Sequence, residues 1–198
     1  MKRTGIRLFW KRTAILFRLQ WRIPLYLCLL LVGFAAGCLL FFRDPTVWSE
    51  RLLPYLTTSP EHGWWSAVAN ACLLRWLLLA ILLASAVSVY GLPIVVAVPP
   101  LYGAILAWSQ CLHYATGGWG VLLAFLQVVL PAAVQIPILL SACSDASRLS
   151  AALAGQLLPG ASHTGLWPLW RSCMLRFLLY FGLSTVSAVG ETAARLWL

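Results

Sequence analysis

Charged residues are scarce in this chain, and acidic residues are the scarcest. Of its 198 residues only 10% are charged, while 62% are hydrophobic; a typical soluble domain has about 25% charged residues. Asp and Glu together number five, and there are three His. So little charge excludes an ordinary soluble domain, because the excess apolar surface must face lipid or other helices. The length fits one compact helical bundle and leaves little for a separate soluble domain.

The motifs of common membrane enzymes and nucleotide-binding proteins are also missing. There is no H-E-x-x-H pair for a metalloprotease, and Gly182-Leu183-Ser184-Thr185 lacks the second glycine of G-x-S-x-G. Gly117-Gly118-Trp119-Gly120 is rich in glycine, but no Lys-Ser/Thr follows it as in a phosphate-binding loop. We therefore predict no catalytic residue, no cofactor and no enzymatic activity.

Cysteine is present, but never as a C-x-x-C pair. The six residues are scattered singly, most of them in apolar stretches where Cys behaves as a small hydrophobic residue. Neither a disulfide framework nor a metal site follows from this spacing. The six are Cys28, Cys38, Cys72, Cys111, Cys143 and Cys173.

The positive charge is concentrated at the N-terminus. Half of the 14 Lys and Arg residues precede Ile23, and residues 23–42 then carry no charge. About 20 apolar residues span a bilayer core of about 30 Å as a helix, and flanking basic residues stay in the cytoplasm. We therefore predict an integral protein of the cell membrane with its N-terminus inside. The run is longer than the apolar core of a signal peptide and no Ala-x-Ala-like site follows it, so it is interpreted as a retained span.

Basic residues within residues 1–23 recur at spacings of four and seven and so share one face of a helix. We interpret this part as a cytoplasmic amphipathic segment on the membrane surface, where each cation near anionic headgroups contributes about 1 kcal/mol. The net charge of +9 is thus assigned to lipid headgroups and not to nucleic acid. Docking of a cytoplasmic partner is the alternative. The predicted anchoring residues are Arg3, Arg7, Lys11, Arg18 and Arg22.

Residues 24–198 are predicted to form one all-α transmembrane bundle of about five helices. The charge-free stretch 76–112 is too long for one crossing, and Tyr90-Gly91-Leu92-Pro93 is its natural break, in a tight cytoplasmic turn. One crossing over 76–96 followed by a half-buried segment is the alternative. Five crossings place the C-terminus outside. The predicted spans are approximately residues 24–42, 66–89, 93–112, 117–143 and 172–190.

Two connections between the spans are long. Residues 43–65 are predicted to be the main outside segment, with three prolines that break it and three tryptophans suited to the headgroup region. Residues 145–171 are predicted to be a cytoplasmic loop, in which Ser144 or Asp145 begins a short surface helix over 146–158.

A few polar residues fall inside the predicted spans and are candidates for intramembrane contacts. Arg75 either extends to the outer headgroups or forms an internal ion pair, for which Glu191 is the best partner. Gln127 and Gln135 lie eight residues apart on one helical face. They are expected to hydrogen-bond between helices, and a path for a polar substrate is the alternative.

Small residues and prolines indicate close packing and bending. Gly33 and Gly37 permit close helix approach in the first span. Two prolines in the fourth span leave backbone carbonyls without partners, so this span is expected to be buried and bent. The candidate packing and kink residues are Gly103, Gly120, Pro131, Gln135 and Pro137.

Several short motifs follow one another between Gly91 and Ser150. Leu101-Tyr102-Gly103-Ala104-Ile105-Leu106 comes first, and Gly117-Gly118-Trp119-Gly120-Val121-Leu122-Leu123-Ala124 follows. Val128-Val129-Leu130-Pro131 and Gln135-Ile136-Pro137-Ile138-Leu139 complete the series. In this order and register the stretch resembles the stage II sporulation protein M family. The chain's size, basic N-terminus and five apolar segments are similar to that family as well.

The resemblance implies a non-catalytic scaffold at the septal membrane of sporulating Gram-positive bacteria. Such a scaffold recruits and stabilises peptidoglycan hydrolases for forespore engulfment. The partners implied are a cell-wall amidase/endopeptidase and a lytic transglycosylase. A membrane subunit of a transporter or permease is the alternative, which the proline-broken spans with Gln127 and Gln135 favour.

Overall fold

The computed structural model describes residues 22–43, 63–115, 129–156 and 166–197. They form five helices, and each is long and apolar enough to cross a membrane. The prediction of an all-helical bundle with five helices able to cross a membrane is confirmed for the described residues, while membrane insertion and the inside-to-outside orientation stay predictions. The helices are α2 (Arg22–Arg43), α4 (Gly63–Val87), α5 (Leu92–Ala115), α7 (Leu130–Gln156) and α8 (Trp167–Trp197).

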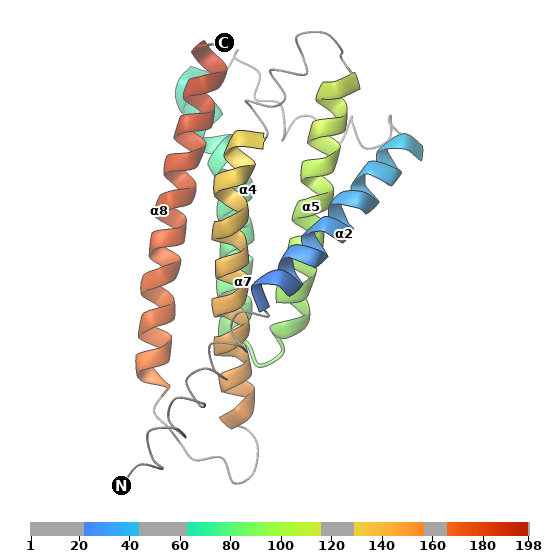
Figure 1. Ribbon diagram of the computed structural model, residues 1–198. Coiled ribbons are helices and arrows are strands. Elements are labelled where there is room, and N and C mark those ends of the chain that lie inside the picture. Colours follow the sequence, from blue (N-terminus) through green and yellow to red (C-terminus); the bar gives the residue numbers. More distant parts are fainter. Residues whose placement is uncertain (1–21, 44–62, 116–128, 157–165, 198) are drawn as a thin grey trace, which may run out of the picture.

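Successive helices run in alternating directions along the bundle (Figure 1). One end holds the start of α2, the connection between α4 and α5, and the start of α8; we call it the Arg22 end. The opposite end, where α2 stops, is the Arg43 end. α4, α5, α7 and α8 stand nearly upright in Figure 1, whereas α2 crosses α5 obliquely.

A tight turn joins α4 to α5. The backbone N–H of Ser88 donates to the carbonyl of Ser85 at 3.1 Å, and that of Gly91 donates to the carbonyl of Ser88 at 3.2 Å. A Cβ on Gly91 would lie 1.7 Å from the carbonyl oxygen of Ser85, so the turn requires glycine. The predicted break at residues 90–93 is confirmed, and the alternative of one crossing over 76–96 is wrong.

α7 differs from the prediction at both ends. The expected span over 117–143 falls partly outside the described residues, and the helix continues to Gln156 without the loop expected from residue 145. The serines and the acid that suggested a loop are buried inside the bundle, where other helices supply their partners. α8 likewise starts before the expected residue 172. Local polarity was therefore misleading here, because it indicates solvent only when no neighbouring helix covers the residue.

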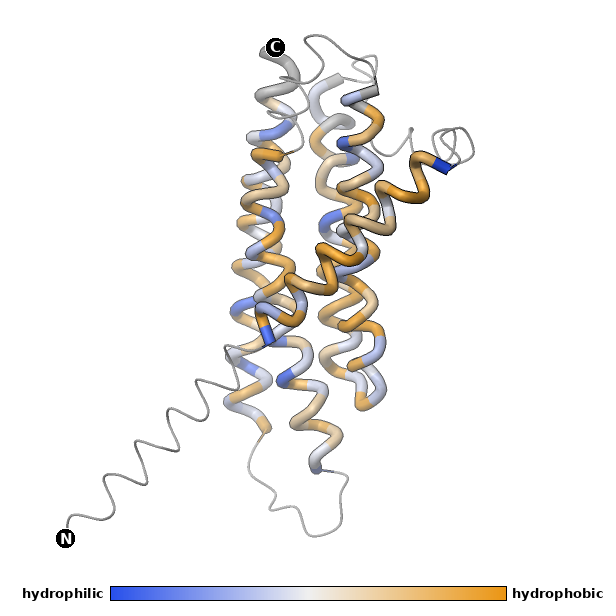
Figure 2. Tube along the Cα trace, turned by 45° about the vertical axis from the view of Figure 1, so that its right-hand side comes forward, coloured by the Kyte–Doolittle hydropathy of each residue, from blue (hydrophilic) through white to orange (hydrophobic). Residues whose placement is uncertain are grey.

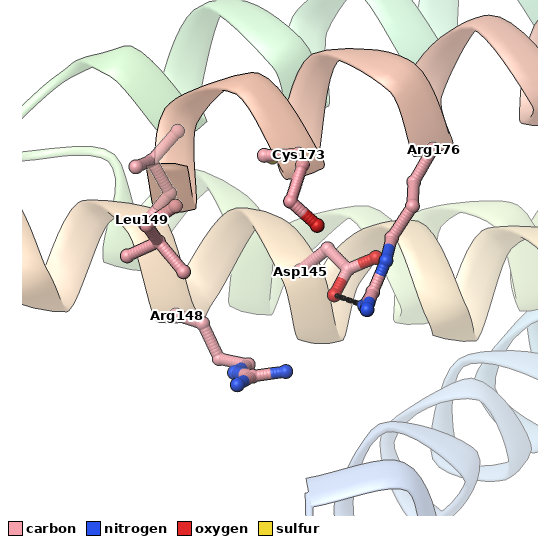
Figure 3. A pocket seen from close by; sticks show the side chains of 7 residues that line it. Asp145, Arg148, Leu149, Cys173 and Arg176 are labelled. Atoms are coloured by element: carbon pink, nitrogen blue, oxygen red, sulfur yellow. Dashed lines mark hydrogen bonds and ion pairs between the residues drawn. The ribbon is translucent and has the colours of Figure 1, made fainter. Parts of the chain in front are cut away.

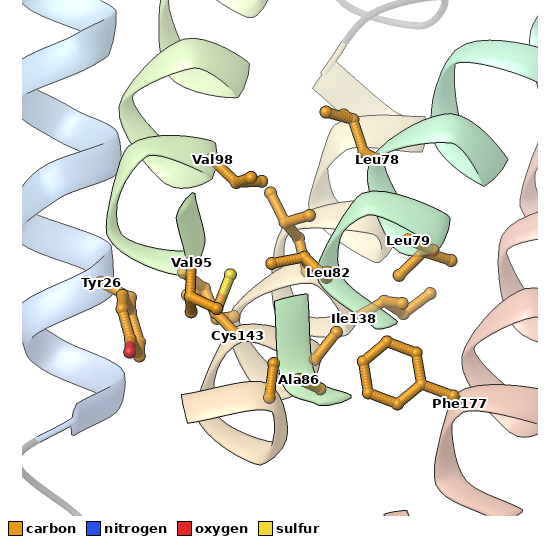
Figure 4. Close-up of a cluster of buried hydrophobic side chains, with 14 of the residues drawn as sticks. Tyr26, Leu78, Leu79, Leu82, Ala86, Val95, Val98, Ile138, Cys143 and Phe177 are labelled. Carbon is orange, nitrogen blue, oxygen red and sulfur yellow. The ribbon is translucent and has the colours of Figure 1, made fainter. Parts of the chain in front are cut away.

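The hydrophobic core lies where α4, α5 and α7 meet, with α8 and α2 closing its sides (Figure 4). Leu79 and Leu82 of α4, Leu139 of α7 and Phe177 of α8 are almost completely buried. In contrast, many large apolar side chains on the outward faces are exposed, and Figure 2 shows hydrophobic residues along the whole length of the helices. Outward apolar surface of this extent is expected of helices that face lipid.

α2 and α5 pack backbone to backbone. A Cβ on Gly33 would lie 2.0 Å from the carbonyl oxygen of Pro100, and one on Gly103 would lie 2.2 Å from that of Leu30. A Cβ on Gly37 would likewise lie 2.7 Å from the Cα of Ala104. The small residues of both helices therefore allow a contact that any side chain would prevent.

Candidate functional site

Polar side chains of α8 follow one face of the helix, the face that packs on α7 and α4. They are spaced three or four residues apart, which places them above one another along the helix. From the first to the last the helix rises about 22 Å, which is most of a hydrocarbon core of about 30 Å. We call them, with their partners on α7 and α4, the polar line. The α8 members are Arg176, Tyr180, Ser184, Ser187 and Glu191.

An acidic residue of α7 anchors the polar line near the Arg22 end. Asp145 accepts hydrogen bonds from the guanidinium of Arg176 at 2.9 Å and from the hydroxyl of Tyr180 at 2.8 Å. The Asp145 side chain is 10% exposed and that of Arg176 is 50% exposed. The carboxylate is thus taken out of solvent but paired, and the arginine extends from the pair towards the surface.

Further polar contacts connect the Arg22 end of several helices. The guanidinium of Arg22 donates to the hydroxyl of Ser147 at 3.3 Å, which joins α2 to α7. The hydroxyl of Ser150 donates to the carbonyl of Ser88 at 2.8 Å, which joins α7 to the turn after α4. Arg22, expected to bind lipid headgroups, therefore also fixes the start of α2 against α7.

The middle of the polar line is a side-chain hydrogen bond in the interior of the bundle. The hydroxyl of Ser184 donates to Oε1 of Gln135 at 3.1 Å, and both residues are completely buried. Within the described residues the Nε2 of Gln135 has no hydrogen-bond partner. A buried amide nitrogen without a hydrogen-bond partner costs free energy. This contact is therefore expected to stabilise the bundle less than the two ion pairs do.

An ion pair between α4 and α8 ends the polar line towards the Arg43 end. The guanidinium of Arg75 pairs with the carboxylate of Glu191 and also donates to the hydroxyl of Ser187 at 3.3 Å. The two charged side chains are 11% and 9% exposed. Next to Arg75, the indole N–H of Trp76 donates to the hydroxyl of Thr185 at 3.2 Å. The structure thus places Arg75 in an internal pair and not in an extension towards headgroups.

The depth of Arg75 explains why it needs this partner. Counting from the turn at Ser88, Arg75 lies about 20 Å along α4 at 1.5 Å per residue. That position is inside a hydrocarbon core of about 30 Å, where an unpaired arginine costs at least about 2.5 kcal/mol on insertion scales. Pairing with Glu191 removes the net charge and fixes the rotation of α8 against α4.

The two ion pairs of the polar line have opposite polarity. Near the Arg22 end the acid belongs to α7 and the base, Arg176, to α8. Towards the Arg43 end the base belongs to α4 and the acid, Glu191, to α8. Because each pair is neutral, the line adds no net charge to the interior, and because each joins different helices, it holds three helices in register.

The sequence prediction of polar contacts covered part of this line. Arg75, Gln135 and Glu191 lie in it, whereas Asp145 and Tyr180 were not predicted to be part of it. The spacing of polar residues on α8 at four, four, three and four could have indicated the line, because it marks one face of a helix. Several predicted residues lie outside the described residues: Arg3, Arg7, Lys11, Arg18, Gly120 and Gln127.

The predicted packing residues lie at different places. Gly103 is in the contact between α2 and α5. Pro131 is buried and lies in the first turn of α7. Pro137 lies further along the same helix, and its side chain is exposed. Among the described residues, no three His, Cys, Asp or Glu side chains gather to form a metal site. The thiols of Cys38 and Cys111, from α2 and α5, lie 3.8 Å apart.

Neither a protein-family model nor a curated protein or solved structure is significantly similar to this chain. The fold defines the class, a helical protein with five candidate membrane spans, and the internal polar line is its candidate functional feature.

Proposed function

We propose that this protein is a non-catalytic scaffold of the cell membrane that holds other membrane-associated proteins laterally. The supporting observation is the polar line, in which Arg75 pairs with Glu191 and Arg176 pairs with Asp145 between helices. Such pairing stabilises one arrangement of α4, α7 and α8 and leaves neutral pairs in the interior. A fixed bundle is what a scaffold requires, because its partners must meet a constant surface.

The outward faces suit lateral association. Leu179 and Val186 on α8 are 65% and 70% exposed, and Val32 and Leu39 on α2 are 65% and 72% exposed. In each pair the residues are seven apart, so they lie on one stripe of their helix. Helices in membranes associate through such packing surfaces, since lipid gives no hydrophobic drive for burial.

The specific partners follow from the resemblance to the stage II sporulation protein M family. We propose that the scaffold recruits and stabilises a peptidoglycan amidase/endopeptidase and a lytic transglycosylase at the septal membrane for forespore engulfment. The short motifs between Gly91 and Ser150 support this assignment.

A transporter or permease subunit is the second candidate, and one observation favours it. The buried Nε2 of Gln135 has no partner within the described residues and lies halfway along a polar line of about 22 Å. A polar solute that crosses the bundle would find a donor there, as in transporters that bind near the bilayer midplane.

Quantitative co-purification from sporulating cells tests the scaffold. The full chain carries an affinity tag, and an unrelated five-span protein with the same tag is the background control. We expect enrichment of both cell-wall hydrolases over background. Two matched variants then locate the contact: Leu179→Trp with Val186→Trp on α8, and Val32→Trp with Leu39→Trp on α2. At least one of the two should lower hydrolase recovery without changing the thermal stability of the bundle.

Other outcomes would reject the scaffold. Recovery of a cytoplasmic ATPase without hydrolases would favour the permease subunit. Hydrolase recovery equal to background, with the tagged chain correctly inserted and folded, would remove the proposed function altogether.

A further inference from the structure

A small cavity between α7 and α8 near the Arg22 end is surrounded by charged, polar and apolar side chains. Its volume of about 70 Å³ has room for several water-sized groups. Figure 3 shows Asp145 and Arg148 extending from α7 and Arg176 extending from α8 around this space. The residues that matter here are Asp145, Arg148, Leu149, Leu169, Ser172 and Arg176.

The cavity has an excess of positive charge. Asp145 is engaged by Arg176 and by the hydroxyl of Tyr180. Arg148 is half-buried and has no hydrogen bond or ion pair within the described residues. One acid against two arginines leaves a formal charge of +1. Arg22, bonded to Ser147 directly before Arg148, adds a further positive charge close by.

The level of the cavity along the bundle corresponds to a membrane surface. α5 stands nearly upright and runs from Leu92 to Ala115, a length of about 36 Å that is enough to cross a hydrocarbon core of about 30 Å, so the α4–α5 turn at its start lies near one membrane surface. The bond from Arg22 to Ser147 and that from Ser150 to Ser88 place this part of α7 level with the start of α2 and with the α4–α5 turn. α7 and α8 continue beyond this level in Figure 1.

Aromatic residues at the start of α8 agree with this level. The rings of Trp167 and Trp170 stack with centroids 5.3 Å apart, and both side chains are exposed. Exposed tryptophans concentrate at the headgroup region, where an amphipathic ring satisfies both environments. The cavity therefore opens where phosphate groups of lipids lie.

We propose that this cavity binds a phosphate group, supplied by the headgroup of an anionic phospholipid. Arg148 is the principal ligand, with the hydroxyl of Ser172 as a second donor and Arg176 shared with Asp145. Leu149 and Leu169 border the same cavity; Leu149 is buried in the core, so the partly exposed Leu169 would contact the glycerol and first acyl carbons. Basic pockets between membrane helices bind anionic headgroups in this manner. The inference does not rest on the proposed scaffold function.

Native mass spectrometry of the full chain tests this site, with phosphatidylglycerol and phosphatidylcholine offered in equal amounts. We expect one phosphatidylglycerol molecule to be retained in preference. Arg148→Gln should weaken this retention about tenfold, as expected for loss of a charge-assisted hydrogen-bonding partner. Arg171→Gln is the matched control, because it removes the same charge from an exposed position of α8 that does not line the cavity. Arg148→Lys should restore part of the retention if charge is recognised.

The outcomes separate the sources of phosphate. Equal loss in Arg148→Gln and Arg171→Gln, with unchanged thermal stability, would show general attraction to a basic surface and overturn the site. Binding of inorganic phosphate that depends on Arg148, without preference for phosphatidylglycerol, would overturn the lipid as its source. Retention of phosphatidylglycerol that millimolar inorganic phosphate does not displace supports the lipid headgroup.

Discussion

The contact of α2 with α5 and the contacts of α8 with α4 and α7 use different physical means. At α2 and α5, three glycines bring the backbones together, and a Cβ on Gly33 would overlap Pro100. At α8, long polar side chains join the helices through two ion pairs and the hydrogen bond from Ser184 to Gln135. One interface depends on the absence of side chains, and the other depends on their polar ends.

Lipid explains why both means occur in one bundle. Apolar helices gain no hydrophobic stabilisation from leaving a hydrocarbon solvent, so close packing or polar contacts must hold them together. Close packing depends on glycines at the points where the backbones meet, whereas an ion pair depends on two charged side chains that reach each other. The difference predicts that the two interfaces fail in different ways when altered.

The largest expected effect comes from breaking the ion pair between Arg75 and Glu191. Glu191→Leu leaves Arg75 buried without a counter-charge, and such a change costs about 3–5 kcal/mol. The thermal unfolding of the protein in detergent, followed by tryptophan fluorescence, should shift clearly downwards. The double variant Arg75→Leu/Glu191→Leu removes both charges and should recover most of the loss, because apolar replacements of buried pairs are often neutral. A double variant as unstable as the single one would contradict the pairing.

A smaller loss is expected from adding one methyl group between α2 and α5. Gly33→Ala forces the helices apart, and overpacking of this kind costs about 1–3 kcal/mol. Gly182→Ala on α8 is the matched control, since a Cβ there meets nothing within 4 Å, and it should be neutral or stabilise by up to about 1 kcal/mol. Equal unfolding temperatures for the two variants would show that α2 does not approach α5 this closely.

The hydrogen bond in the middle of the polar line is expected to contribute least. A double-mutant cycle of Ser184→Ala and Gln135→Leu should give a coupling energy of about 0.6 kcal/mol, the average for such bonds in membranes. Gln135→Leu alone should be close to neutral, because it also removes the unpartnered amide nitrogen. A coupling energy of zero would indicate that the two side chains do not meet.

Cross-linking checks the register of α2 and α5 without a change in stability. The thiols of Cys38 and Cys111 are 3.8 Å apart, and a disulfide needs about 2.05 Å, so a small movement suffices. Diamide, which accepts the two hydrogens of a thiol pair, should join these cysteines, as seen by peptide mapping under non-reducing conditions. Cys38→Ser is the control. A link from Cys111 to any other cysteine would require a different register.

The sequence located the break between α4 and α5 because its cause is local. A glycine that must lie within reach of the Ser85 carbonyl, followed by a proline at the start of the next helix, has the same meaning in any bundle. The continuation of α7 was missed for the opposite reason. Asp145 and the serines around it resemble a loop until Arg176, Tyr180 and Arg22 from other helices supply partners.

The polar line was predictable in part. Arg75 required either headgroups or a counter-charge, and so few acids are present that Glu191 stood out as its partner. The choice between the two depended on the position of α8, which no local pattern gives. The pairing of Asp145 with Arg176 was not foreseen, because Asp145 was predicted to lie in a cytoplasmic loop and not in a span.

By itself the sequence determined that this protein has apolar helices long enough to cross a membrane, since the hydrophobicity and the length of each segment can be read without knowing its neighbours in space. It also determined the turn at Gly91 and the capacity of α2 for close packing. Only the tertiary structure decided which polar residues meet, because residues more than 100 positions apart, such as Arg75 and Glu191, come together through helix packing. Their pairing follows from the high energy of an isolated charge in a medium without water.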